Sequence, residues 1–152
     1  MFQDHLTNYY EEKDLVGLME QKIPFNAFLG VKVEFFSRGE IILSLPSRPE
    51  FTGDPLRPAL HGGLLATLAD TAAGMAVFSI LPKTATTSTI DLRIDYLRPG
   101  NIDQQVYAKS SVVRHGSRVC VTQTTIYQDS YDQAVAISSA TYSIVQHKTL
   151  PI

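Results

Sequence analysis

The segment from His61 to Ala76 contains one acid, Asp70, within a stretch that is otherwise mostly apolar. Its neighbours three and four residues away are Ala, Thr and Gly, so no cation is placed to pair with it on a helix. A charged group without a partner on a buried helix is costly. Asp70 is therefore either a structural residue hydrogen-bonded by another element or a functional one, and we favour function because perturbed acids gather at active sites.

Two adjacent glycines, Gly62 and Gly63, stand where the helix that carries Asp70 is expected to begin. The first turn of a helix has backbone N–H groups without an internal partner, and glycine lets a ligand approach them closely. Such donors could hold a reacting carbonyl oxygen, as in an oxyanion hole. The alternative is that the glycines only allow the helix to pack tightly against a sheet.

The spacing of these groups limits how they can cooperate. His61 and Asp70 are nine residues apart, which is about 13.5 Å along a helix and on opposite faces. They cannot form a His–Asp pair within one chain. For Asp70 and the N–H groups of Gly62 and Gly63 to act on one carbonyl, Asp70 must meet the helix start of a second copy. A two-fold dimer with antiparallel helices satisfies this, so we predict a dimer at least.

The histidines and the single cysteine are weaker candidates. His61 could be a ligand, a general base or a residue that caps and orients the helix start, and we favour the last role because no partner carboxylate is near it in sequence. Cys120 lies in an alternating strand pattern, which predicts a buried, inert thiol rather than a nucleophile. His5, His115 and His147 are scattered along the chain, so the sequence predicts no metal site.

Several cations lie at the ends of predicted strands. Lys109, Arg114 and Arg118 flank one turn, and Arg98 flanks another. Arginine forks suit phosphate oxygens, so these residues are candidates for holding the phosphates of a large anionic substrate. The alternative is ordinary solvated surface charge.

The elements that must position these groups follow from hydrophobic periodicity. Residues 3–22 show helical spacing, Pro24 is expected to end that helix, and residues 25–29 are expected to form a short apolar turn. A hairpin over residues 31–45 and a proline-rich loop over 46–58 lead to a helix that begins at about residue 61. Alternating segments rich in Val, Ile, Thr and Tyr predict further antiparallel strands at 86–97, 105–113, 118–128 and 134–146.

Composition excludes several classes of protein. The chain has 152 residues, 13 Lys and Arg against 15 Asp and Glu, and one Cys. It is long enough for one core, lacks the basic surface that nucleic acid or an anionic membrane requires, and cannot form an internal disulfide. The acidic N-terminus does not resemble a secretory signal, and the apolar stretch 64–80 is short for a membrane span and contains Asp70. We expect a cytoplasmic protein with no nucleic-acid or membrane partner.

The predicted helix is apolar nearly all round, so a sheet must surround it. One long helix wrapped by a curved antiparallel sheet of five to six strands is an α+β arrangement, the outline of a hot-dog fold. We divide the chain into an N-terminal helical segment (1–24), a single hot-dog domain (25–146) and a C-terminal tail (147–152).

Two motifs carry a resemblance to a known family. The segment from His61 to Ala76, with His-Gly-Gly followed by an acid nine residues after the His, and the segment from Thr89 to Gly100 together resemble the hot-dog acyl-CoA thioesterases of the phenylacetate-pathway (PaaI-like) type. The similarity runs from about residue 25 to 145. Members of this family hydrolyse acyl-CoA thioesters without a metal or cofactor, as dimers that usually pair into tetramers with sites at the dimer interface.

The resemblance implies a role for each matching residue. Asp70 matches the catalytic acid, which acts as general base or as nucleophile, and Gly62 matches the residue whose N–H polarises the thioester carbonyl. His61 matches the histidine beside it, and Thr89 falls close to a Ser or Thr that helps place the water. Many relatives carry an Asn six residues before the His, where this chain has Pro55.

These readings predict hydrolysis of an acyl-CoA to free acid and CoA. An acyl-CoA-binding sensor or carrier of the same fold is an alternative, although the residues before the core are too few and too acidic for a DNA-binding domain. A hot-dog dehydratase is a further alternative, and it is disfavoured because no His is placed beside an acid as that chemistry requires.

Overall fold

The computed structural model describes residues 8–148 and begins with a helical segment. Helix α1 (Glu12–Gly17) continues into a π-helical turn, η2 (Leu18–Lys22), and α2 (Pro24–Leu29) follows. Part of the predicted helix, residues 3–7, lies outside the described residues. The predicted turn after Pro24 is wrong: Pro24 occupies the first turn of α2, where proline is favoured, and α2 ends at Gly30 in the left-handed conformation.

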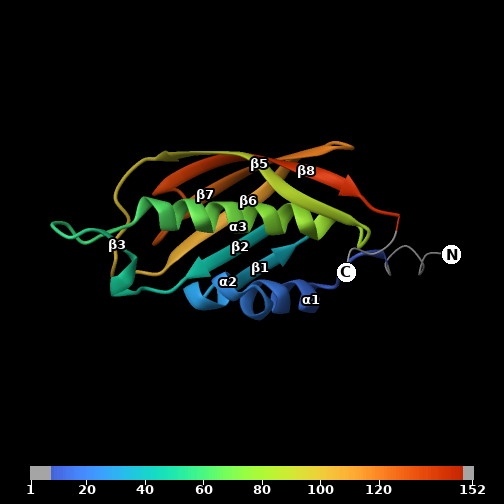
Figure 1. The fold of residues 1–152 in the computed structure, drawn as a ribbon. Helices are drawn as coiled ribbons and strands as arrows, with labels where there is room; N and C mark the ends of the chain where they lie inside the picture. The colour runs from blue at the N-terminus through green and yellow to red at the C-terminus, as the bar shows by residue number, and fades with distance from the viewer. Residues whose placement is uncertain (1–7, 149–152) are drawn as a thin grey trace.

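The six predicted strands form one antiparallel sheet (Figure 1). Its strands are β1 (Lys32–Ser37), β2 (Glu40–Leu45), β5 (Ala85–Tyr96), β6 (Val106–His115), β7 (Val119–Tyr127) and β8 (Ala136–Gln146). They lie in the order β1-β2-β6-β7-β8-β5, so β5 forms one edge and is paired on one side only, with β8.

Between β2 and the long helix, the proline-rich loop contains a short 3-10 turn, η3 (Pro49–Phe51), and a small two-stranded ribbon of β3 (Thr52–Asp54) and β4 (Ala59–Leu60). The long helix α3 (Gly62–Ile80) starts where the sequence predicts it.

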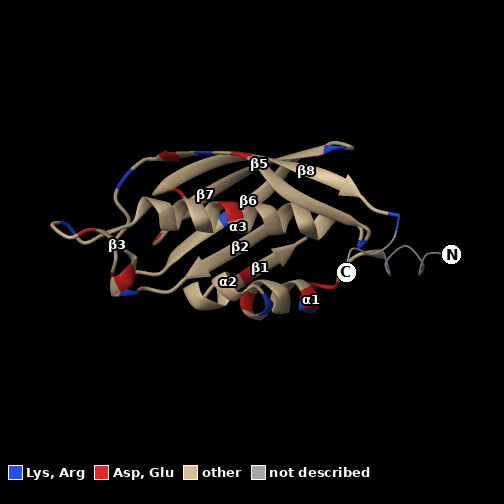
Figure 2. Cartoon of the chain, viewed as in Figure 1, with Lys and Arg blue, Asp and Glu red and all other residues tan. Residues whose placement is uncertain are grey.

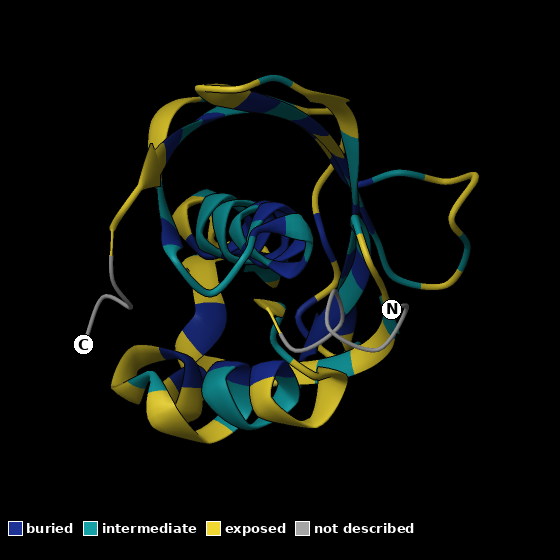
Figure 3. Cartoon of the chain, turned by 90° about the vertical axis from the view of Figure 1, so that its right-hand side faces the viewer, coloured by how far each residue is buried: buried dark blue, intermediate teal, exposed yellow. Residues whose placement is uncertain are grey.

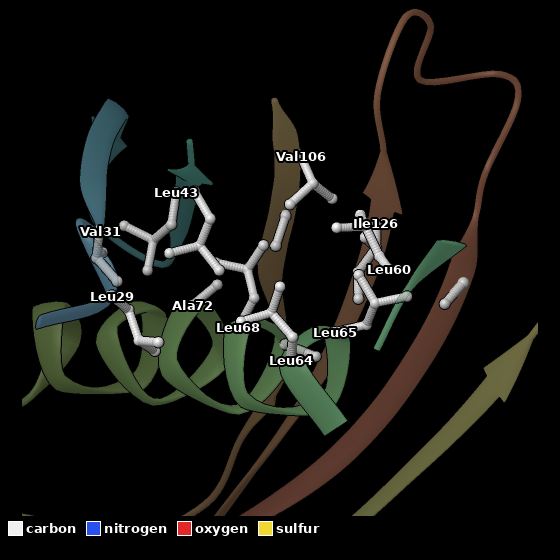
Figure 4. Close-up of a cluster of buried hydrophobic side chains, with 14 of the residues drawn as sticks. Leu29, Val31, Leu43, Leu60, Leu64, Leu65, Leu68, Ala72, Val106 and Ile126 are labelled. Atoms are coloured by element: carbon white, nitrogen blue, oxygen red, sulfur yellow. The ribbon is translucent and has the colours of Figure 1, made fainter. Parts of the chain in front are cut away.

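The sheet curves around α3, and α1, η2 and α2 lie beneath its open side (Figure 3). Ten of the residues of α3 are buried. The core between α3 and the sheet is made of aliphatic side chains such as Leu43, Leu65, Leu68 and Ile126 (Figure 4), each contributing roughly 1.5–3 kcal/mol when fully buried. The predicted α+β hot-dog arrangement is confirmed.

Helix α3 is the one helix among residues 8–148 that is long and apolar enough to cross a membrane. More than half of its most apolar window is buried inside the protein. The prediction of a buried core helix in this segment is confirmed.

Candidate active site

Asp70 lies in the middle of α3, and its carboxylate is held by two hydroxyl groups from the sheet. Thr89 Oγ1 donates to Asp70 Oδ1 at 2.9 Å, and Tyr142 OH donates to the same oxygen at 2.8 Å. Both hydrogen bonds reach Oδ1, and no donor within residues 8–148 reaches Oδ2. The second oxygen is therefore free to take a proton from a substrate or water, or to attack.

Tyr142, on β8, is the more deeply buried of these two donors and was not predicted. Its side chain is 2% exposed, and its hydroxyl also donates to the backbone oxygen of Asp70 at 2.9 Å. Burial, together with the hydrogen bond to the carboxylate, raises the pKa of Tyr142 above the ordinary value of a tyrosine. It therefore remains a protonated donor throughout the neutral range. A tyrosine on the inward face of a strand needs a hydrogen-bond partner for its hydroxyl, and this requirement is the feature of the sequence that could have indicated the contact.

Thr89 reaches Asp70 because β5 is irregular at this point. The pairing register with β8 shifts between Thr89 and Asp91. The extra residue, Ile90, is 60% exposed, whereas the unbroken alternation of the sequence predicts that it shares a face with Leu92. A bulge changes which side chains point inward on its two sides. This one brings the Thr89 hydroxyl onto the same side as the helix.

The start of α3 is arranged around His61. The Nδ1 atom of His61 accepts a hydrogen bond from the Gly63 N–H at 2.9 Å, so His61 is the N-cap of α3. The backbone oxygen of His61 accepts from Leu64 N–H at 3.0 Å. The Gly62 N–H has no acceptor within residues 8–148. Of the two glycines named from the sequence, Gly62 therefore offers the free donor.

Tyr96, at the end of β5, lies against the helix start. Its hydroxyl donates to the backbone oxygen of Gly62 at 2.9 Å. A Cβ atom at Gly62 would stand 3.3 Å from the Tyr96 ring, so a larger residue there would press on the ring. The absence of a side chain at Gly62 therefore lets the Tyr96 ring pack closely against the helix start.

Asp70 and the helix start line different cavities of the same chain. Asp70 and Thr89 line a cavity of about 380 Å³ between α3, β5 and the N-terminal helices. His61 and Gly63 line another of about 290 Å³ beside α2. One chain thus presents the acid and the helix-start donor in separate places, as the helical spacing predicts.

The four predicted phosphate-binding cations are not brought together. Arg114 and Arg118 lie exposed at the two sides of the β6–β7 turn. Arg98 follows β5 at the opposite end of the sheet and donates to the backbone oxygen of Gln133. Lys109 is 3.4 Å from Glu40 Oε1, an ion pair between β6 and β2.

The remaining predicted groups have no place in this site. Cys120 is buried, and burial raises the pKa of its thiol, which disfavours the reactive thiolate. His147 Nε2 is 2.8 Å from Thr86 Oγ1, and His115 lies exposed at the end of β6. His5 lies outside the described residues. No cluster of three or more His, Cys, Asp or Glu side chains in the described part of the chain could hold a metal ion.

The charge distribution separates Asp70 from the other acids. Figure 2 shows that most charged residues lie on the loops, on the strand ends and on the N-terminal helices, whereas Asp70 is the one charge on α3. An acid on an enclosed helix, a fixed hydroxyl environment and a free N–H at the helix start define a hot-dog protein equipped to act on a carbonyl group.

Comparison with known proteins agrees with a hot-dog protein that acts on a carbonyl group. Residues 58–134, half of the chain, match the family model described as the Thioesterase superfamily. The chain belongs to this superfamily and is a thioester hydrolase.

Individual relatives show the same relationship. The chain is 35% identical over 145 residues to a Salmonella typhimurium protein named medium/long-chain acyl-CoA thioesterase YigI, covering 86% of this chain and 92% of the relative. It is 47% identical over 103 residues to a putative esterase from Halobacterium salinarum, covering 66% of this chain and 67% of the relative. A solved structure of the phenylacetic acid degradation protein PaaI from Thermus thermophilus, in a mutant form, aligns with a TM-score of 0.70 and 27% identity over 79% of this chain and 97% of the other. The predicted PaaI-like resemblance is confirmed.

Proposed function

We propose that this protein hydrolyses medium- to long-chain acyl-CoA thioesters to the free acid and CoA, with Asp70 as the catalytic carboxylate. The observation that carries the proposal is the setting of Asp70, whose Oδ1 is fixed by Thr89 and Tyr142 while Oδ2 is free. The acyl-length class is supported by relatives from Salmonella typhimurium and Escherichia coli that are named medium/long-chain acyl-CoA thioesterases.

The cavity beside Asp70 supports an acyl-binding role. Its volume of about 380 Å³ lies within the usual range for small-molecule sites, about 300–1,000 Å³. Part of its wall is apolar, with Leu18 and Ile23 from the N-terminal helices and Met75 and Phe78 from α3. An extended hydrocarbon chain matches such a lining.

Two copies are needed to complete a site in this proposal. Asp70 and the Gly62 N–H lie eight residues apart on α3, about 12 Å along its axis. The outer edge of β5 has free backbone donors and acceptors, and Ile90 is exposed on it. Antiparallel pairing of two β5 edges would continue the sheet and bring Asp70 of one copy toward Gly62 of the other. A homodimer is the minimal active unit, and pairing of dimers would give the expected tetramer.

The chemistry then divides between the copies. The Gly62 N–H of one copy holds the thioester carbonyl oxygen. Asp70 of the other takes a proton from water through Oδ2, and the oxygen of that water attacks the carbonyl carbon. Alternatively, Oδ2 attacks directly and forms an anhydride that water hydrolyses. In either route the C–S bond breaks, the CoA thiolate accepts a proton, and Thr89 and Tyr142 keep the carboxylate in place.

Arg114 and Arg118 are the candidates for the phosphates of CoA, since both are exposed on one turn. Arg98 and Lys109 already interact with Gln133 and Glu40, respectively. Their contribution to CoA binding would require these contacts to open.

Release of free CoA thiol from acyl-CoAs of short, medium and long chain, and from an aromatic acyl-CoA, tests the proposal. We expect turnover of medium and long chains, a loss of roughly a hundredfold or more in D70N, and retained binding. D103N, which changes an exposed loop acid, is the matched control. Hydrolysis by pure D70N at the wild-type rate would refute the role of Asp70. Binding without turnover by the wild-type protein would support an acyl-CoA-binding module instead.

A further inference from the structure

The cavity beside Asp70 contains polar side chains that the proposed reaction does not use, among them Asn26 and Thr87. Asn26 lies on α2 and is 4% exposed. Its one side-chain hydrogen bond within residues 8–148 runs from Nδ2 to Met19 Sδ at 3.6 Å, and a thioether sulfur is a weak acceptor. The Oδ1 atom of Asn26 accepts no hydrogen bond from the described residues, so the amide keeps capacity for a ligand.

Thr87 adds an independent observation in the same cavity. Its Oγ1 atom is buried and has no hydrogen-bond partner among the described residues. Buried hydroxyls are normally paired, so an unpaired one calls for an explanation. A single χ1 rotation exchanges the hydroxyl and methyl positions of a threonine, which would turn the hydroxyl toward a ligand.

The other buried or catalytic hydroxyls of this cavity are already engaged. Thr71 Oγ1 donates to the backbone oxygen of Thr67 at 2.7 Å, and Thr89 and Tyr142 donate to Asp70. Ser88 also lines the cavity, but it is exposed. Among the buried polar groups of the cavity, unused hydrogen-bonding capacity therefore lies at Asn26 and Thr87.

We propose that Asn26 and Thr87 form a subsite for an oxygen atom on the acyl chain. The preferred substrates are then acyl-CoAs with a hydroxyl or keto oxygen near the sixth carbon. This inference rests on the proposed function and narrows its substrate class. An amide can donate to or accept from such an oxygen, and a threonine hydroxyl can do either, so the pair suits both oxygen types.

The position of the subsite follows from β5. Thr89 meets Asp70, and Thr87 precedes it by two residues, about 7 Å along a strand. With the thioester carbonyl beside Asp70, this spacing places Thr87 about five bonds further along an extended acyl chain. The rest of the chain then continues between α3 and the N-terminal helices.

The test compares 6-hydroxydecanoyl-CoA with decanoyl-CoA. We expect the wild-type kcat/KM to favour the hydroxylated substrate roughly tenfold, the scale of one well-placed hydrogen bond. The preference should fall toward one in N26L and in T87V. T71V is the matched control, because it removes a hydroxyl of the same cavity that is already paired, and it should keep the wild-type preference.

Thermal unfolding of T87V provides a second readout. If the Thr87 hydroxyl serves a ligand, T87V should have the wild-type Tm or a higher one, because an unpaired buried hydroxyl is removed. A marked fall in Tm would show that this hydroxyl is structural and would overturn its assignment.

Calorimetric binding of both acyl-CoAs to D70N separates this inference from the proposed function. A tighter Kd for the hydroxylated substrate supports the subsite even if turnover fails. Equal Kd values, or a wild-type kinetic preference that N26L and T87V leave intact, would overturn the subsite and leave thioester hydrolysis standing. Absence of turnover on either substrate would count against the proposed function alone.

Discussion

Replacement of Gly62 by proline tests the helix-start donor directly. Gly62 is the first residue of α3, where proline is well tolerated. The Gly62 N–H donates to no acceptor within residues 8–148, so G62P removes no hydrogen bond from the described part of the folded chain. The preceding residue, His61, has φ −63° and ψ 128°, an extended conformation that is compatible with a following proline. G62P therefore removes one N–H while preserving the helix.

The structure sets the expected size of the effect. The Gly63 N–H is occupied by His61 Nδ1, and the N–H groups of Leu64 and Leu65 bond the His61 backbone oxygen. No neighbouring donor in the first turn can replace Gly62. Loss of one oxyanion-hole donor lowers kcat by about 10²–10³, and we expect G62P to fall in this range.

The control for G62P is G62A. Both variants place a Cβ 3.3 Å from the Tyr96 ring, but alanine keeps the N–H. We expect G62A to be much more active than G62P in the CoA-release assay at matched Tm values. Equal activities would refute the role of the N–H and attribute the loss to crowding of Tyr96.

Mixing G62P with D70N tests whether the site is shared. Random pairing makes half of the dimers mixed, and each mixed dimer has one complete site, so activity should recover to about a quarter of the wild-type value. A mixture no more active than its parents would contradict a site built from two copies.

Three further predictions concern Tyr142 and Cys120. Y142F keeps the buried ring but loses the hydrogen bonds to Asp70. We expect the free energy of unfolding to fall by about 1–3 kcal/mol and kcat to be lower. Unchanged kinetics would contradict the positioning role of Tyr142. Because burial and the Asp70 hydrogen bond raise the pKa of Tyr142, the unfolded chain releases this proton first as pH rises through about 10. The wild-type protein should then lose up to about 1.4 kcal/mol per pH unit from this group, a loss absent in Y142F; parallel denaturation curves from pH 8 to 11 would disprove it. Finally, Cys120 should resist alkylation in the native protein and react in denaturant, whereas rapid native labelling would show that the thiol is accessible.

The fold was predictable because its signals are local. The apolar helix over residues 62–80 and the alternating strands can be recognised from consecutive residues, and short turns make β6, β7 and β8 antiparallel neighbours. The expectation that consecutive strands pair fails for β5, which pairs with β8 and not with β6, the strand that follows it along the chain. The error at residues 25–29 came from treating Pro24 as the end of a helix, although proline also begins helices.

The site was predictable only in part. Asp70 and Gly62 could be found because an isolated acid and a glycine pair are unusual on an apolar helix. Tyr142 was missed because it is 72 residues from Asp70, and only the folded sheet brings them together. The bulge near Ile90 cannot be recognised in the alternating pattern either. It changes which side chains point toward the helix, but the residue types themselves still alternate. Asn26 was missed for the same reason as Tyr142.

The setting of Asp70 and one wall of its cavity come from different elements, which has an evolutionary consequence. The geometry of Asp70 depends on α3, β5 and β8, whereas one wall of the adjoining cavity comes from the N-terminal helices, which lie beneath the open side of the sheet (Figure 3). Substitutions at Leu18 or Ile23 can therefore reshape the cavity without moving the acid. Under the proposed mechanism, substrate range and catalytic rate can change independently, and homologues with divergent N-terminal helices can acquire new acyl preferences while the helix that carries Asp70 stays the same.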